Sequence, residues 1–157
     1  NLAIALKLRE VLIKQGVVVL MTRDGDYDLS SPNVSRRKKS DFDNRIDLIN
    51  NSNADLYLSI HINYLEASKY YGAQVFYTDG NELLANIMQD SFVSYLNSPL
   101  KEKKVSSDIY MYNKLKVPGL LIECGFLSNS NERNLLKSDD YQYKIVKSIV
   151  KALIKYY

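Results

Sequence analysis

The chain has 157 residues, of which 46% are hydrophobic and 25% charged, and a formal net charge of +3. This size fits one domain with an ordinary core, and so small a charge gives no reason to expect nucleic-acid binding. A single cysteine, Cys124, excludes an internal disulfide, and no apolar run approaches the roughly 20 residues that span a bilayer. We therefore expect one domain over residues 1–157.

Apolar residues at helical spacing and turn residues between them predict most of the helices. The predicted helices cover residues 2–15, 81–96, 129–137 and 139–156. Gly16 is expected to end the first helix. The Ser-Asp-Phe-Asp sequence of residues 40–43 resembles a capping box and predicts the start of a further helix. In that helix we expect Phe42, Ile46 and Ile49 to be buried and Asp41 to pair with Arg45.

Short apolar and β-branched runs predict the strands. These runs are residues 17–21, 56–60, 72–78, 109–112 and 119–122, with polar loops expected over 22–39 and 99–107. The alternation of helices and strands predicts a three-layer α/β sandwich whose mixed sheet is mostly parallel and is flanked by helices.

The chain begins at Asn1 rather than at Met and opens directly on a helical pattern. We therefore expect an N-terminally truncated domain whose first strand would precede residue 1. A sheet without that strand would leave unpaired backbone groups at an edge. This predicts self-association through the exposed edge.

Two chemically active side chains end apolar runs, His61 after residues 54–60 and Glu123 after residues 120–122. Ligands of open α/β sheets bind at the carboxyl ends of strands, so we expect both side chains at the same edge. Imidazole is a good zinc ligand, and a nearby carboxylate can take a proton from water. Asn63 and Asn129 are expected to donate hydrogen bonds to a substrate carbonyl.

Each of these features has a simpler alternative. A lone histidine after an apolar run is commonly a hydrogen-bonded packing residue, whereas a buried carboxylate is costly unless it is paired or functional. Cys124 is expected to be a small buried residue that faces away from Glu123. The basic run at residues 36–39 is expected to be a solvated loop, with contact to an anionic polymer or partner as the alternative.

Four short motifs occur in order along the chain. They are Met-Thr-Arg-Asp at 21–24, Asn-Arg at 44–45, Ser-Ile-His-Ile-Asn at 59–63 and Ile-Glu-Cys-Gly-Phe-Leu-Ser-Asn at 122–129. Together they resemble the zinc-dependent N-acetylmuramoyl-L-alanine amidases of the LytC-like type, over essentially the whole chain. Residues 72–77 and 109–111 are most similar to the sporulation-specific branch, which prepares muramic-δ-lactam in spore cortex. The resemblance implies hydrolysis of the amide between the lactyl group of N-acetylmuramic acid and L-alanine.

The resemblance also implies a single catalytic zinc ion held by two histidines and a glutamate. His61 matches the second histidine and Glu123 the catalytic glutamate, and Arg45, Asn63 and Asn129 are the expected substrate-binding residues. The first histidine belongs to a Gly-His-Gly-Gly segment that, like the ligand glutamate, would precede residue 1. We therefore expect this polypeptide to bind zinc weakly or not at all.

By the same resemblance, the expected partner is a peptidoglycan strand with its stem peptide, and an activating protein is a further expectation. Action outside the cytoplasm follows, in the cell wall or between the forespore membranes. Two alternatives remain: a non-catalytic member of the fold that binds glycan or a partner protein, and an unrelated doubly wound domain with His61 in its core. An intact Glu123 favours the enzyme.

Overall fold

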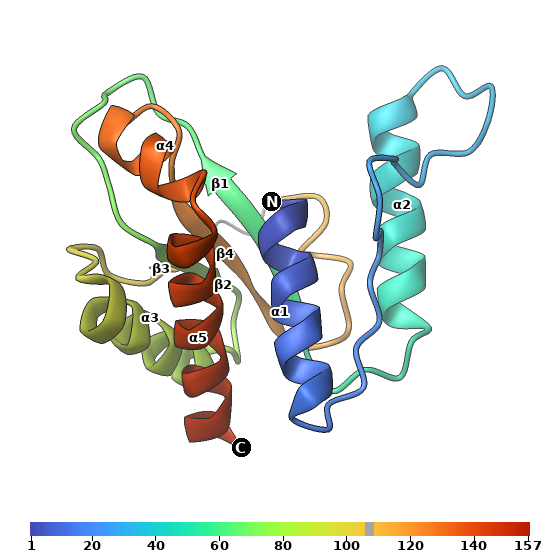
Figure 1. Cartoon of the computed structure of the whole chain (residues 1–157). Coiled ribbons are helices and arrows are strands. Elements are labelled where there is room, and N and C mark those ends of the chain that lie inside the picture. Colours follow the sequence, from blue (N-terminus) through green and yellow to red (C-terminus); the bar gives the residue numbers. More distant parts are fainter. Residues whose placement is uncertain (106–108) are drawn as a thin grey trace.

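The computed structural model describes residues 1–105 and 109–157, and it places helices around a small mixed sheet (Figure 1). The strands are β1 (Tyr57–Asn63), β2 (Gln74–Tyr77), β3 (Lys103–Lys104) and β4 (Gly119–Phe126). The helices are α1 (Leu2–Lys14), α2 (Arg37–Asn50), α3 (Glu82–Leu96), α4 (Ser130–Leu136) and α5 (Asp139–Tyr156). The predicted fold class, an α/β domain with helices flanking a mixed sheet, is confirmed.

Within the described residues the sheet has the strand order β1-β4-β2-β3. β1 runs parallel to β4, β2 runs antiparallel to β4, and β3 runs parallel to β2. Two of these pairings are parallel, as the sequence predicts. In the part of the chain that the structure describes, β1 pairs along one edge only.

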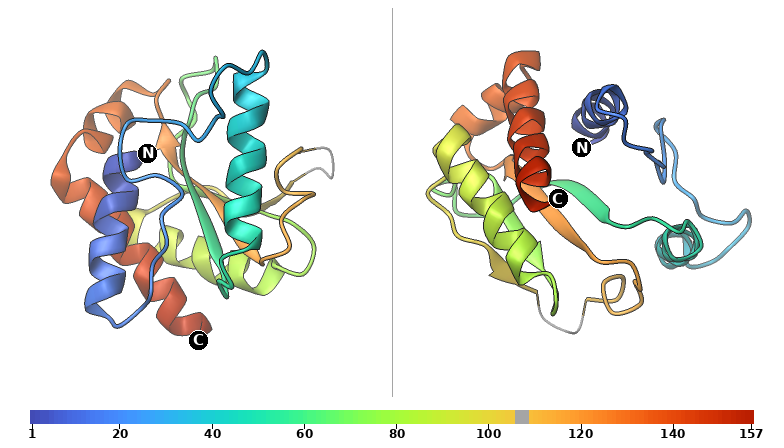
Figure 2. Two further views of the ribbon diagram at one scale, coloured as in Figure 1. Left: turned by 90° about the vertical axis from the view of Figure 1, so that its right-hand side faces the viewer. Right: turned by 90° about the horizontal axis from the view of Figure 1, so that it is seen from below.

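The apolar core lies between one face of the sheet and the helices α1, α3 and α5 (Figures 1 and 2). Inward positions of β4 alternate with outward ones, so Leu120, Ile122 and Cys124 are fully buried on the helical side. α3 contributes Met88 and Phe92 at helical spacing. The prediction for Cys124, small, buried and facing away from Glu123, agrees with this alternation.

α2 stands apart from the other helices, as Figure 2 shows from two sides. Ile46 is its one buried residue, whereas Phe42 and Ile49 are only partly buried, contrary to expectation. Polar contacts attach the helix to the segment before it: Asp41 accepts a hydrogen bond from the Leu29 amide at 2.8 Å. The predicted pairing of Asp41 with Arg45 is present at 2.9 Å.

The predicted strand at residues 17–21 is wrong. The segment is irregular, and Val18 is 97% exposed. β-branched residues favour a strand only where a neighbouring strand completes the backbone hydrogen bonds, and no described strand lies beside this segment.

The predicted capping box is also wrong. α2 begins at Arg37, three residues before Ser40, and places most of the basic run in its first turn. The Ser40 hydroxyl accepts instead from the Ser31 amide at 2.9 Å, outside the helix. Ser40 and Asp41 thus accept hydrogen bonds from the loop before the helix instead of capping the helix.

Several strands also differ from expectation, and β2 (Gln74–Tyr77) is shorter than the predicted run at 72–78. Residues 110–114 form a turn rather than a strand, and β3 lies inside the expected loop at 99–107, of which residues 106–107 fall outside the described residues. β1 and β4 extend beyond their predicted ends, so they include His61 and Glu123. The remaining predicted helices are confirmed to within one or two residues, and Gly16 follows α1 with a φ of +83°. None of the described helices is long and apolar enough to cross a membrane.

Candidate active site

His61 and Glu123 lie side by side on the sheet. They are direct partners in the parallel register of β1 and β4, and Gln74 of β2 is opposite Glu123 on the other side. Because side chains alternate along a strand, both residues project from the face opposite the buried Ile122 and Cys124. The sequence predicted a common strand edge; the structure places the pair inside the two strands and on a common face.

The His61 ring is held by a neighbour on its own strand. The Ser59 hydroxyl lies 2.9 Å from Nε2 of His61, and the side chain of Tyr112 lies beside Ser59. Tyr112 also stacks on Tyr57 with 6.5 Å between ring centroids. Burial lowers the pKa of His61, and the positive charge of Arg45 contributes in the same direction. The ring is therefore neutral near pH 7, which is the form that binds a metal.

Glu123 is the carboxylate of this face. Its Oε2 atom is buried and has no hydrogen-bond partner among the described residues. Burial raises the pKa of Glu123 from 4.5 to about 7. A carboxyl group with such a pKa can both accept and return a proton near neutral pH, which is the property of a general acid–base catalyst.

This face of the sheet also meets part of the requirement for a catalytic zinc site. The imidazole of His61 is a suitable ligand and the unpartnered Glu123 carboxylate can take a proton from water, but catalytic zinc normally takes three protein ligands. Among the described residues, no group of three His, Cys, Asp or Glu side chains is arranged to hold a metal ion. The residues of this chain therefore fit one side of a zinc site.

The three predicted substrate-binding residues have structural partners. Arg45 pairs with Asp41 and donates from Nη1 to the Thr22 hydroxyl at 2.9 Å. Oδ1 of Asn63 accepts from the Tyr64 amide at 2.8 Å. Asn63 is the last residue of β1, two positions after His61, whereas Arg45 on α2 affects the His61 ring through its positive charge.

Asn129 is the N-cap of α4. Its Oδ1 accepts from the amides of Asn131 and Glu132, each at 3.1 Å, and its Nδ2 donates to the Ser68 carbonyl at 3.0 Å. The Asn129 side chain thus joins the start of α4 to the segment after β1. It is not in the row formed by His61 and Glu123.

Sequence reasoning missed Ser59 and Tyr112. The position of Ser59 beside His61 could have been predicted from the sequence, because residues two apart in a strand share a face and Ser59 precedes His61 by two. No local pattern could place Tyr112, which reaches Ser59 from a turn more than fifty positions later in the chain.

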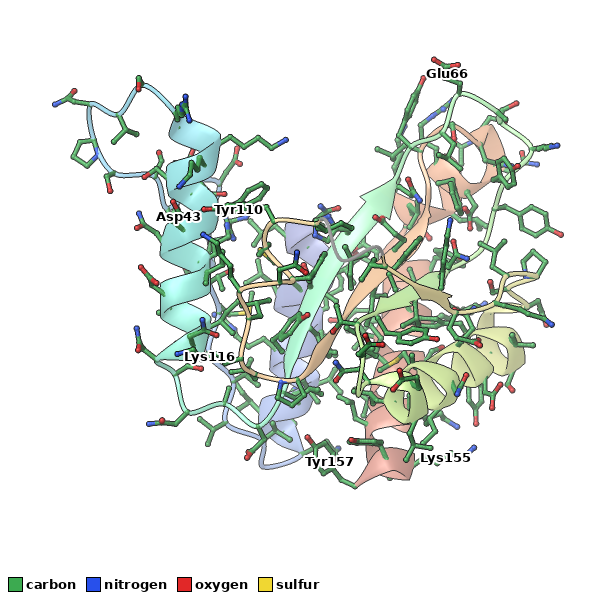
Figure 3. The ribbon with its side chains drawn as sticks, turned by 180° about the vertical axis from the view of Figure 1, so that it is seen from behind. Asp43, Glu66, Tyr110, Lys116, Lys155 and Tyr157 are labelled. Carbon is green, nitrogen blue, oxygen red and sulfur yellow. The ribbon has the colours of Figure 1, made fainter. Side chains whose placement is uncertain are left out.

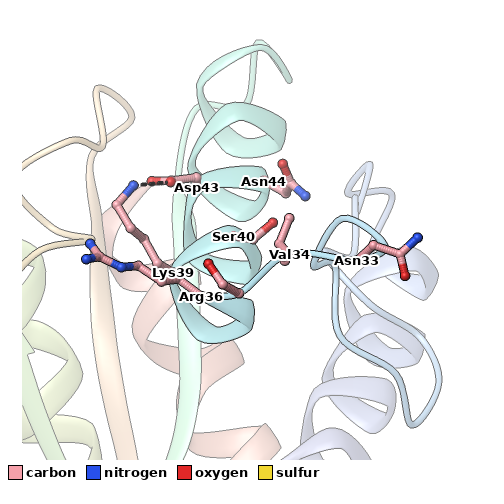
Figure 4. A pocket seen from close by; sticks show the side chains of 8 residues that line it. Asn33, Val34, Arg36, Lys39, Ser40, Asp43 and Asn44 are labelled. Carbon is pink, nitrogen blue, oxygen red and sulfur yellow. Dashed lines mark hydrogen bonds and ion pairs between the residues drawn. The ribbon is translucent and has the colours of Figure 1, made fainter.

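A separate cavity of about 540 Å³ lies beside α2 (Figure 4). It is lined by residues 33–36 together with Lys39, Ser40, Asp43 and Asn44. The Lys39–Asp43 ion pair, at 2.6 Å, crosses its wall. None of its lining residues belongs to β1 or β4, so the cavity is distinct from the His61–Glu123 pair.

The chain is similar to known proteins of one family. The family described as N-acetylmuramoyl-L-alanine amidase matches residues 1–155. The chain is 40% identical over 163 residues to the germination-specific N-acetylmuramoyl-L-alanine amidase of Bacillus subtilis (strain 168). The aligned region covers 100% of this chain and 69% of that protein.

Two solved structures share the fold. The CwlD amidase from Clostridioides difficile, in complex with the GerS lipoprotein, has a TM-score of 0.92 and 38% identity over 99% of this chain and 83% of that one. The catalytic domain of CwlV from Bacillus (Paenibacillus) polymyxa var. colistinus has a TM-score of 0.84 and 24% identity, over 99% of this chain and 82% of that one. The fold is thus that of an amidase catalytic domain. The chain belongs to the N-acetylmuramoyl-L-alanine amidase family.

Proposed function

We propose that residues 1–157 form the catalytic domain of a zinc-dependent peptidoglycan amidase that acts on spore cortex. The reaction is hydrolysis of the amide between the lactyl group of N-acetylmuramic acid and L-alanine. The observation that carries the proposal is the direct register of His61 with Glu123, in a chain that matches the amidase family over residues 1–155.

In this proposal His61 is a zinc ligand and Glu123 is the general base. Zinc, when bound, polarises the amide carbonyl and lowers the pKa of water. Glu123 accepts a proton as water adds to the carbonyl carbon and returns it to the leaving nitrogen as the carbon–nitrogen bond breaks. The products are a lactyl carboxylate and a stem peptide with a free L-alanine amino group. The buried Oε2 atom of Glu123 has no hydrogen-bond partner among the described residues and is therefore available for both transfers.

The neighbouring residues have supporting roles in the proposal. The hydroxyl of Ser59 orients the His61 ring, and the Tyr112 side chain beside Ser59 limits the space around that hydroxyl. Arg45 offers a positive charge to the carboxylates of a stem peptide, and Asn63 offers its amide NH₂ group. For Asn129 the same role requires that its bond to the Ser68 carbonyl be exchanged for one to the substrate.

Location and partners follow from the similar proteins. The relative from Bacillus subtilis is described as germination-specific, and the Clostridioides difficile CwlD structure contains the GerS lipoprotein. We accordingly propose that this chain acts outside the cytoplasm on the peptidoglycan of the spore and that a protein partner contacts it.

The proposal also includes self-association. β1 pairs along one edge among the described strands, and the irregular segment before α2 exposes Val17 and Val18. An unpaired strand edge is a template for a strand from another copy of the chain. Light scattering of this 157-residue chain should show dimers or larger species, whereas a monomer at high concentration would contradict this part of the proposal.

The experiment that tests the function uses the natural protein that contains this chain, incubated with spore peptidoglycan and zinc. Mass spectrometry should detect glycan strands without stem peptides and new L-alanine amino termini. Release should stop in EDTA and return with added zinc. Binding to peptidoglycan without any release would contradict the proposal and favour the non-catalytic alternative.

A further inference from the structure

Glu132 is a buried carboxylate that the proposed reaction does not use. It lies on α4, is 4% exposed, and accepts two backbone hydrogen bonds. Oε1 accepts from the Gly72 amide at 2.8 Å and Oε2 from the Phe126 amide at 2.7 Å. Each carboxylate oxygen thus holds a different segment of the chain.

The bond to Phe126 falls where β4 departs from regular pairing. His61 is opposite Glu123 and Asn63 is opposite Phe126, so β4 has one more residue than β1 between these pairs. Such an extra residue is a β-bulge, which bends a strand and redirects its side chains. The bulge therefore begins directly after the proposed catalytic base.

Gly125 sits inside this bulge with a φ of +150°. A Cβ atom on Gly125 would lie 3.0 Å from Oε2 of Glu132, closer than side chains normally approach. The Glu132 carboxylate and the glycine therefore fit against each other, and the carboxylate holds the amide that follows the glycine. The shape of the bulge depends on both residues.

The bond to Gly72 ties the same carboxylate to the segment that leaves β1. This segment, residues 64–72, passes beside α4 in Figure 1 and carries Tyr64, which is 68% exposed. Gly72 itself has a φ of +94° and begins the approach to β2. Glu132 therefore joins the end of β4 to the segment 64–72, which follows β1.

We propose that Glu132 is a positioning residue of the amidase, which fixes the bulge after Glu123 and thereby the direction in which the Glu123 carboxylate points. This inference rests on the proposed function. Glu132 contacts backbone amides rather than the reacting atoms, so its effect on the reaction is transmitted through β4. Two accepting oxygens are required, because a single accepting atom would leave one of the two buried amides unpaired.

The test is Glu132→Gln in the zinc-loaded natural protein. The amide keeps the shape of the side chain but presents an NH₂ group to one of the two donors. We expect kcat to fall about tenfold or more while KM stays within about threefold and zinc content is unchanged, as for a misplaced catalytic group. A lower melting temperature with wild-type kcat would overturn the inference, because it would show a merely structural role.

Two further variants make the result decisive. Gly125→Ala disturbs the same bulge from the other side, and it should lower kcat in parallel; wild-type kcat in Gly125→Ala would overturn the inference even if Glu132→Gln fails to fold. Ser91→Ala is the control, because it removes a buried hydrogen bond to the Ser148 carbonyl between α3 and α5, far from the bulge. It should lower stability without changing kcat.

A measurement on this chain separates the inference from the proposed function. In protein labelled with ¹³C at glutamate carboxyls, the Glu123 resonance should shift in Glu132→Gln and not in Ser91→Ala. An unmoved Glu123 resonance would overturn the inference. If the wild-type natural protein releases no stem peptide while the resonance does shift, the proposed function fails and the positioning of Glu123 by Glu132 stands.

Discussion

The two faces of the sheet differ in composition and in burial. The face under α1, α3 and α5 is apolar and closed, and it buries Leu120, Ile122 and Cys124 completely. The opposite face carries His61 and Glu123, and Figure 3 shows how α2 and the 110–114 turn stand beside it. Burial of apolar area dominates stability, whereas an unpartnered carboxylate is a cost that catalysis can explain. β4 therefore places alternate residues in the apolar core and on the face of the proposed active site.

The most drastic way to test this division is Glu123→Gln in the zinc-loaded natural protein. The change removes the proposed base with almost no change in shape, so kcat should fall by roughly 10²–10⁴. The circular dichroism spectrum and melting temperature should stay near those of the wild type. A variant that retains more than about a tenth of the activity would remove Glu123 from the mechanism.

A core substitution on the other face should have the reverse effect. Ile149 of α5 is fully buried, and Ile149→Ala should lower the free energy of unfolding by about 2–5 kcal/mol, measured by urea denaturation. The activity of the fraction that remains folded should be unchanged. Ile154→Ala, on the same helix but 67% exposed, is the matched control and should change stability by less than about 0.5 kcal/mol.

A smaller effect is expected in the pH dependence of stability, because the pKa of Glu123 changes on folding. Its pKa is raised from 4.5 to about 7 in the folded chain, so folding favours the protonated form between these values. In EDTA, the wild type should therefore lose stability relative to Glu123→Gln as the pH rises from 4.5 to 7. The difference should be on the order of 1 kcal/mol, since the group is partly exposed. A pH-independent difference would contradict the raised pKa.

The smallest expected effect concerns the attachment of α2. Tyr110 donates a hydrogen bond to Asp43, and the two side chains meet between the turn and the helix (Figure 3). Tyr110→Phe removes this bond and should destabilise the contact by about 0.5–1 kcal/mol. Hydrogen exchange should become faster in α2 and remain unchanged in α5. Equal acceleration in both helices would show that α2 is coupled to the core after all.

The local sequence pattern predicts the apolar helices and strands correctly. It fails where an element depends on a neighbouring strand or a hydrogen-bond partner outside the local sequence. α3 and α5 follow from periodicity because one stripe of each is buried against the core. The segment at 17–21 has the composition of a strand, but composition supplies no neighbouring strand. Ser40 and Asp41 look like the start of a helix, yet they accept hydrogen bonds from the 29–31 segment. A competing hydrogen bond to the preceding loop cannot be predicted from four adjacent residues.

The sequence by itself determined which chemistry this protein can carry: one histidine, one glutamate within an apolar run, and four motifs in the order typical of an amidase. Only the tertiary structure decided that His61 and Glu123 are neighbours in register, that the Ser59 hydroxyl contacts the imidazole, and that Glu132 accepts a hydrogen bond from the bulge beyond Glu123. The reason is physical. Residue type and spacing fix what a side chain can do, whereas register, burial and distant hydrogen bonds fix where it points and how readily it gives up a proton.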